Sequence, residues 1–349
     1  MPFIDHRQLR LFATSVFETV GTPRDIATFV ADSLVDANLA GHDSHGVLRL
    51  PGYCGSLNVG DIIPGARATL IKRDRASAIV DGTLGWGQPA LQLAAETTVE
   101  LTRECGLGGT VVRRCYHVGR VAPYVEHIAR SGLIGIAMSN AGPGVAPFGG
   151  RQRVLGTNPF AWSMPIGGDA DPLTFDIATA AIAEGKLRVA RASHRTIATG
   201  MLVDVEGVSS QDPDDFFAGG AILPFGGHKG NGISILAQML GRALAGMDTT
   251  EFEGPRGANG PVVIAIDPAC FTSPDEFRSE VAAQAKLITD STPAEGYSEV
   301  LLPGEIERRT ERERRSTGIP IPETTWAELG DLATSLGITM IDGGVESRE

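Results

Sequence analysis

The chain has 349 residues, of which 42% are hydrophobic and 21% charged, so it can bury a core without disulfides or a structural metal. With 30 Lys and Arg against 42 Asp and Glu, its formal net charge of −12 argues against nucleic acid or an anionic membrane as a partner. Its 4 cysteines lack metal-site spacing and no apolar run reaches about 18 residues, so a cytoplasmic protein with reduced cysteines is expected.

Two helices are predicted at the N-terminus. Apolar residues recur at helical spacing over residues 9–20 and again over 26–35. The stretch "TPRD" offers Thr22 as the N-cap of the second helix with Pro23 at its first position, and Gly41 marks its expected end.

The motif "GHDSHGVLRLPGY" follows at residues 41–53. Its histidines, His42 and His45, lie three positions apart, but no third ligand supports a metal site. A proton-transfer role for His45 needs only one imidazole, which titrates near neutral pH. If the chain then forms a short helix that Pro51 limits, Arg49 lies on the face of His45 and can bind a carboxylate; a surface ion pair is the alternative.

From about residue 70 to 270, short β-branched runs alternate with glycine-rich turns and helical stretches, a pattern typical of a sheet covered by helices. Predicted strands are "ASAIVDG", "GGTVVRR", "LIGIAMSN", "FAWSMPI", "LTFDIAT", "MLVDVEG" and "PVVIAIDP". Helices are predicted over 88–103, 122–130 and 230–244, the last with a buried stripe of Ile233, Leu236, Leu240 and Leu244.

Two more residues of this region are candidates for chemistry. Asp176 ends a predicted strand, and a buried carboxylate there would fix the tautomer of the His45 ring and favour its protonated form. His117 follows another strand at a turn before a helix and is a candidate to face the same cleft, with a purely structural histidine as the alternative.

The common nucleotide and hydrolase motifs are missing from the sequence, including G-x-G-x-x-G, the P-loop, H-E-x-x-H and G-x-S-x-G. The turn "PFGGHKGNG" leads into a helix and carries Lys229, so backbone amides, the helix dipole and a cation could together bind a phosphate. A flexible turn with a solvated lysine is the alternative.

The C-terminal part carries a charged run, residues 305–315, which predicts a solvated helix with i,i+4 ion pairs. Thr325 and Glu328 are spaced as a capping box before a last helix, which is expected to pack on the N-terminal pair.

Taken in order, "ADSLVDANLAGHDSHGVLRLPGY", "HVGRVAPY", "APFGGRQRVLGTNPFAWSMP", "FDIATAAIAEGK", "LPFGGHKGNGIS" and "LPGE" resemble the malate/L-lactate dehydrogenase family, which lacks a Rossmann fold. The resemblance implies an α/β fold of three α/β/α layers with a mixed sheet, plus a helical domain formed from both termini. It implies that residues 1–70 with 305–349 form the helical substrate and dimerisation domain, and that 71–304 form the NAD(P)-binding domain. A homodimer is implied as well.

The resemblance also implies roles for single residues. His45 matches the family's proton donor, with Ser44 beside it and Asp176 as its carboxylate partner, while His117 matches a histidine with the acid/base role in some members. Arg49 and Tyr53 match substrate-facing positions. The positions that match cofactor contacts are Asn140, Asn158, Asp176, Ile177, Ala178, Thr179, Ala180, Ala181, Lys229, Gly230, Pro303, Gly304 and Glu305.

The function that follows is hydride transfer, with NAD or NADP, to or from C2 of a small 2-oxo or 2-hydroxy acid, with an imidazolium as proton donor and Arg49 on the carboxylate. No metal is expected. The alternatives are a reductase of cyclic 2-imino acids, a nucleotide-binding homologue without activity, and a metal-dependent lyase or hydrolase. The sequence does not distinguish NAD from NADP.

Overall fold

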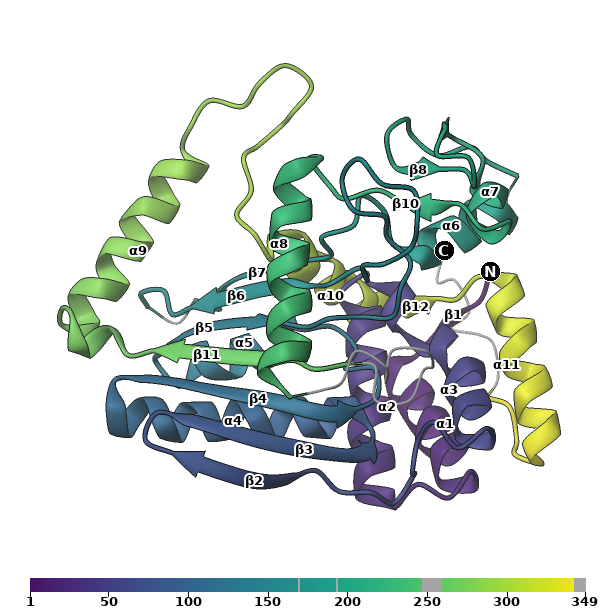
Figure 1. Cartoon of the computed structure of the whole chain (residues 1–349), viewed down its shortest axis with the longest axis horizontal. Coiled ribbons are helices and arrows are strands. Elements are labelled where there is room, and N and C mark those ends of the chain that lie inside the picture. Colours follow the sequence, from purple (N-terminus) through teal and green to yellow (C-terminus); the bar gives the residue numbers. More distant parts are fainter. Residues whose placement is uncertain (169, 193, 247–258, 342–349) are drawn as a thin grey trace.

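A seven-stranded mixed sheet organises the chain (Figure 1). The structure is a computed structural model that describes residues 1–168, 170–192, 194–246 and 259–341. In spatial order the strands are β2 (Thr69–Asp74), β3 (Ser77–Gly85), β4 (Leu107–Cys115), β11 (Val262–Ile266), β5 (Ile134–Met138), β6 (Phe160–Met164) and β7 (Leu173–Ile177). Only β3 and β4 pair in parallel among them, so the predicted mixed, non-Rossmann sheet is confirmed.

Helices lie on both faces of this sheet, which confirms the predicted three layers (Figure 1). Small strand residues such as Ala137, Ala161 and Ala265 pack under α4 (Gly87–Cys105) and α5 (Ala122–Arg130). The opposite face carries α8 (His228–Met239), which continues as a π-helical segment, Leu240–Leu244. The predicted bounds of α4 lie within two residues of those observed, and the bounds of α5 agree in full.

The prediction of a buried stripe on the helix after residue 230 is wrong. Leu236 and Leu244 are 47% and 56% exposed, and only Leu240 packs against the sheet. The helix buries a polar and small-residue face instead, which includes Ser234 and Gln238. The prediction failed because helical spacing identifies an apolar face but does not say which face meets the sheet.

The helical part comes from both ends of the chain, as predicted. One core joins α1 (His6–Thr19), α2 (Arg24–Leu39), α3 (Leu50–Asn58) and α11 (Glu323–Leu336). Two short strands, β1 (Phe3–Ile4) and β12 (Ile319–Pro320), pair in antiparallel fashion and tie the termini together. The last helix packs on α1 and α3.

Three predicted details of the helix ends are wrong, each because of a proline. Pro23 and Pro322 occupy the N-cap positions themselves, with ψ near 142° and 144°. Thr22 therefore caps nothing, and Thr325 and Glu328 lie inside α11 rather than at its boundary. The third is Pro51, which lies in the first turn of α3 and starts that helix rather than ending one.

The chain from about residue 184 to 225 forms a small lobe of its own, above the sheet in Figure 1. It contains α6 (Glu184–Ala192), α7 (Pro213–Phe217) and a three-stranded sheet of β8 (Leu202–Val203), β9 (Ser209–Ser210) and β10 (Ala221–Ile222). "MLVDVEG" belongs to this lobe and not to the main sheet. Its two-residue strand packs in a separate core with Leu187 and Phe216.

Two more helices lie near the C-terminal end. The sequence pattern did not predict α9 (Pro274–Thr289), which begins with a capping box of Ser273 and Glu276 and lies beyond the strand ends at the left of Figure 1. The charged run forms α10 (Glu305–Thr317), with the expected Glu311–Arg315 ion pair. The proposed division at residues 70 and 305 stays a prediction, and its last part, residues 342–349, lies outside the described residues.

Candidate active site

A cavity of about 880 Å³ lies where the end of the sheet meets the 41–53 motif and the small lobe. The motif contributes three of the predicted site residues, His45, Ser44 and Arg49. The other residues that line the cavity include His117, Arg120, Ala141, Thr157, Asp176, Ala181, Glu184, Lys186, Arg242 and Asn259.

The first part of the motif folds as two successive 3-10 turns, Asp43–His45 and Val47–Arg49, before α3 begins at Leu50, rather than as one continuous short helix. Asn38 determines this shape, because its amide oxygen accepts from the N–H of Val47 at 2.9 Å and its amide nitrogen donates to Asp43 at 2.6 Å. Gly46 packs so closely on Asn38 that an added Cβ would lie 2.2 Å from the amide oxygen.

The Arg49 side chain still folds back toward His45, although the predicted helical spacing is absent. Its Nε donates to the carbonyl of Ser44 at 2.7 Å, and Arg49, Ser44 and His45 line the same cavity. The guanidinium is therefore held beside the imidazole by a backbone contact.

Helix α10 braces the motif from outside. Arg314 donates to both carboxylate oxygens of Asp43, at 2.7 and 3.1 Å, and Glu307 lies 3.3 Å from the Nε2 of His42. The charged run is thus more than the solvated helix that was predicted, because part of its charge is used in holding the site.

The two candidate histidines meet in the cavity wall. Their rings stack with centroids 5.6 Å apart and an interplanar angle of 17°. The Nδ1 atom of His45 forms a 3.0 Å hydrogen bond with the Oγ of Ser44, and the Nδ1 of His117 lies 2.6 Å from the hydroxyl of Tyr53. Two imidazoles, each anchored through Nδ1, are brought to one place.

Burial and nearby cations keep both imidazoles neutral. Burial lowers the pKa of His45 to about 3, helped by the positive charges of Arg49 and Arg120. Burial also lowers the pKa of His117 well below its usual value, with the charge of Arg49 adding to the effect. An imidazolium at neutral pH therefore requires an anion to offset these charges.

Tyr53 does not face the cavity as the sequence suggested. It is 3% exposed and contacts Phe17, Trp86 and Tyr116 in a buried aromatic cluster. Its hydroxyl reaches His117 and accepts from the Nε2 of Gln88 at 3.2 Å. Gln88 was not among the predicted site residues; the only signal for it is a polar side chain on the buried face of a helix.

Asp176 lies in the cavity wall at the end of β7, but its hydrogen bonds do not reach His45. Its Oδ2 accepts from the backbone N–H groups of Val121 and Ala122, at 2.9 and 2.8 Å, at the start of α5. In the described ranges, no hydrogen bond joins it to the His45 ring. The carboxylate caps a helix, and the nearest partner of His45 Nδ1 is Ser44.

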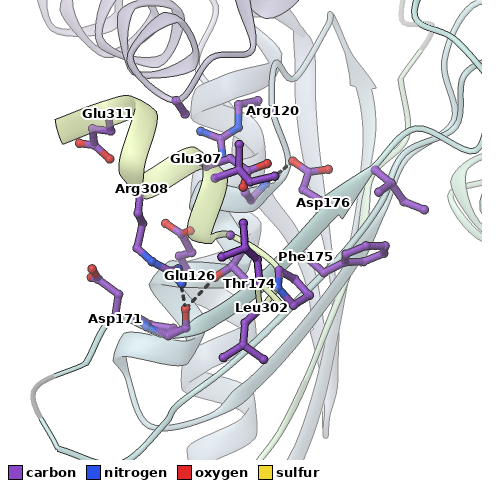
Figure 2. Close-up of a pocket in the computed structure, with 18 of the residues that line it drawn as sticks. Arg120, Glu126, Asp171, Thr174, Phe175, Asp176, Leu302, Glu307, Arg308 and Glu311 are labelled. Atoms are coloured by element: carbon purple, nitrogen blue, oxygen red, sulfur yellow. Dashed lines mark hydrogen bonds between the residues drawn. The ribbon is translucent and has the colours of Figure 1, made fainter. Parts of the chain in front are cut away.

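A second cavity of about 420 Å³ adjoins the first, and the two share Arg120, Asp176 and Ile177. Figure 2 shows it between α10, α5 and β7, with Arg120 beside Asp176 and Glu307, and with Arg308 beside Glu126. The Nε of Arg120 is buried without a hydrogen-bond partner in the described ranges. A buried donor normally has an acceptor. The junction of the two cavities is therefore suited to an anion that would accept from Arg120.

The predicted cofactor residues divide into four groups. Ile177, Ala178, Ala180 and Ala181 line the larger cavity, while Pro303 and Gly304 line the smaller one, with Glu305 accepting from the N–H of Leu302 at 2.7 Å. Asn140, Asn158 and Thr179 are fully buried and hold neighbouring loops together. Lys229 and Gly230 lie in the first turn of α8 and border neither cavity.

Within the same described ranges, no group of three His, Cys, Asp or Glu side chains could hold a metal ion. Nor does any helix there have the length and apolar character needed to cross a membrane. All 4 cysteines are free thiols.

Comparison with known proteins identifies the family of the chain. Residues 4–330 match the profile described as malate/L-lactate dehydrogenase. The chain belongs to this family. It is 36% identical over 333 residues to the L-sulfolactate dehydrogenase of Methanocaldococcus jannaschii, covering 94% of this chain and 95% of that one.

Another relative is the Δ1-pyrroline-2-carboxylate/Δ1-piperideine-2-carboxylate reductase of Pseudomonas syringae pv. tomato, 33% identical over 342 residues, with 95% of this chain and 96% of that protein covered. The solved structure of the M. jannaschii sulfolactate dehydrogenase superimposes with a TM-score of 0.87 at 34% identity, covering 96% and 98% of the two chains. The predicted family and fold class are confirmed. The protein is therefore an oxidoreductase of a family that acts on hydroxy acids.

Proposed function

We propose that the protein is an NAD(P)-dependent oxidoreductase that exchanges a hydride with C2 of a small 2-oxo or 2-hydroxy acid. The observation that supports it most is the shared cavity wall of His45, His117 and Arg49, which combines proton-transfer groups with a carboxylate-binding cation. Relatives named sulfolactate dehydrogenase and malate dehydrogenase match nearly the whole length of the chain.

In this proposal Arg49 binds the substrate carboxylate. Its Nε is already used on Ser44, which leaves the two terminal nitrogens of the guanidinium for the ligand. The bound carboxylate then offsets the charge that lowers the pKa of His45. Substrate binding thus favours the imidazolium, which gives its proton to the C2 oxygen during reduction and takes it back during oxidation.

The residues present also fit a dinucleotide. Arg120 offers a buried, unpartnered Nε at the junction of the two cavities, where a pyrophosphate would accept from it. The Pro303 and Gly304 backbone would border the end of the cofactor in the smaller cavity. The chemistry that NAD or NADP supplies when bound is hydride exchange with C2 of the substrate.

A cyclic 2-imino acid is the second candidate substrate, favoured by the relative from P. syringae. The same residues serve both reactions, because a 2-imino acid also carries a carboxylate for Arg49 and receives a proton after hydride transfer. The difference lies in whether oxygen or nitrogen takes that proton.

We propose that the protein forms a homodimer through one face of the sheet. Ile264, Ile136, Trp162 and Phe175 are register partners across four strands on the α8 side, and each stays partly exposed. The outer face of α8 and its π-helical continuation adds Leu236 and Leu244, which are also exposed. A second copy would cover this apolar surface. Sedimentation of the purified protein tests it, and a monomer at micromolar concentration would contradict it.

The test of the activity is a spectrophotometric screen at about 340 nm, where reduced nicotinamides absorb. Purified protein is mixed with NADH or NADPH and pyruvate, oxaloacetate, sulfopyruvate, diketogulonate or a cyclic 2-imino acid, and with oxidised cofactors and ureidoglycolate. Cofactor turnover that disappears in Arg49→Met supports the proposal and identifies substrate and cofactor. Binding of cofactor with no turnover of any substrate would favour a nucleotide-binding homologue instead.

A further inference from the structure

The hydroxyl of Tyr53 is held between two polar groups inside the aromatic cluster. It lies 2.6 Å from the Nδ1 of His117 and 3.2 Å from the Nε2 of Gln88. The ring is packed against Trp86 and Tyr116 at centroid distances of 5.4 and 5.7 Å. A side chain enclosed in this way has no surface to offer a substrate, so its polar atom acts on His117.

The two partners of this hydroxyl determine the direction in which its hydrogen points. The amide nitrogen of Gln88 has hydrogens and no lone pair to offer, so it donates to the Tyr53 oxygen. The single hydrogen of the phenol is then directed at His117 Nδ1, and burial raises the pKa of Tyr53, which keeps that hydrogen in place. A neutral imidazole whose Nδ1 accepts carries its own hydrogen on Nε2.

We propose that Tyr53 and Gln88 are positioning residues that hold neutral His117 as its Nε2–H tautomer, with this N–H as the donor that the ring offers to a ligand in the cavity. His117 lines that cavity and stacks on His45, so the donor lies beside the proposed proton-transfer group. The two histidines then divide the work: His45 transfers the proton, while neutral His117 donates a hydrogen bond to the reacting oxygen or nitrogen. The division of work rests on the proposed function, whereas the tautomer is a property of the free protein.

The tautomer is measured directly with protein carrying ¹⁵N-labelled histidine, in long-range ¹H–¹⁵N spectra at pH 7.5. The His117 signals are assigned by their loss in His117→Gln. We expect an unprotonated Nδ1 and a protonated Nε2 in the wild type, and a mixture of tautomers in Tyr53→Phe, which keeps the ring but loses the donor. Protonated Nδ1 in the wild type, or an unchanged pattern in Tyr53→Phe, would overturn the proposal.

Tyr116→Phe is the matched control. It removes another hydroxyl of the same cluster, one that bonds to Ser56 at 2.6 Å rather than to a histidine, so the His117 pattern should stay as in the wild type. Gln88→Met is a second test variant that leaves Tyr53 in place, and it should also mix the tautomers because the phenol is then free to rotate. A change in the His117 tautomer pattern that is as large in Tyr116→Phe as in Tyr53→Phe would count against the proposal.

Kinetics separate the positioning role from substrate contact. With any substrate that is turned over, Tyr53→Phe should lower kcat by about 10-fold to 100-fold, the size of the loss when the hydrogen-bond partner of a metal-bound histidine is removed. KM should change little. A higher KM at unchanged kcat would mean that Tyr53 binds substrate and would contradict the proposal. If no substrate reacts, the proposed function fails, while the spectra still decide the tautomer.

Discussion

Arg314 of α10 binds both carboxylate oxygens of Asp43 in the histidine-bearing motif, across 271 positions of sequence. The Arg314 side chain is 15% exposed, so this contact is mostly shielded from water, whereas Asp43 is 38% exposed. The C-terminal part of the chain therefore holds the candidate active site in shape as well as closing the helical core.

Arg314→Gln is expected to destabilise the fold by about 1–2 kcal/mol, because Asp43 loses a charged donor but keeps partial contact with water. Urea unfolding measures this. The matched control is Arg315→Gln on the next position, whose i,i+4 pair with Glu311 is exposed and should be worth less than about 0.5 kcal/mol. Equal losses in both variants would mean that Arg314 is an ordinary surface residue.

A second prediction concerns Gly46, where a Cβ would lie 2.2 Å from the Asn38 amide oxygen. Gly46→Ala should cost about 1–3 kcal/mol of stability, because the motif must move or Asn38 must give up its contacts with Val47 and Asp43. Gly52→Ala is the control: it is helical with open space around it, so alanine there should be neutral or stabilise by up to about 1 kcal/mol. Chemical denaturation of both variants gives the comparison.

The sequence was sufficient for the parts of the fold that depend on local periodicity. The helix over 122–130 was predicted with its observed bounds, and the strands of the seven-stranded sheet other than β2 were all anticipated. It was insufficient where contacts from far away decide. The exposed face of α8 and the separate lobe around β8 both depend on what packs against them, which no spacing records.

The same limit applies to the site. The candidates His45, Arg49 and His117 were found from residue types and Ser44 from the family resemblance, and all four line one cavity. Gln88 and Asn38 were missed, because an amide that organises its neighbours resembles any other polar residue in a helix. Arg120 was also missed as a site residue, since its unpartnered Nε appears only once the cavities are known.

Acid stability is the third prediction. Because the folded-state pKa of His45, about 3, lies below the unfolded value near 6.5, the unfolded chain binds a proton first as pH falls. The wild type should therefore lose stability as pH drops from about 6.5 toward 3, by up to about 1.4 kcal/mol per pH unit from this one residue. His45→Gln should show a shallower decline in urea melts at pH 7, 6 and 5. An identical slope in the two proteins would show that His45 titrates normally.

The last prediction decides which histidine transfers the proton. His45→Ala should lower turnover by about 100-fold or more, the usual effect of losing an acid/base group, while circular dichroism stays that of the wild type. His117→Gln should lose less, because a neutral hydrogen-bond donor stabilises developing charge without moving a proton, and glutamine retains an N–H. His194→Asn, on the exposed surface of the small lobe and compatible with the positive φ of 50° found there, is the control and should be unchanged. If His45→Ala keeps wild-type turnover and His117→Gln loses it, the roles are reversed, and Tyr53 would then act on the proton donor itself.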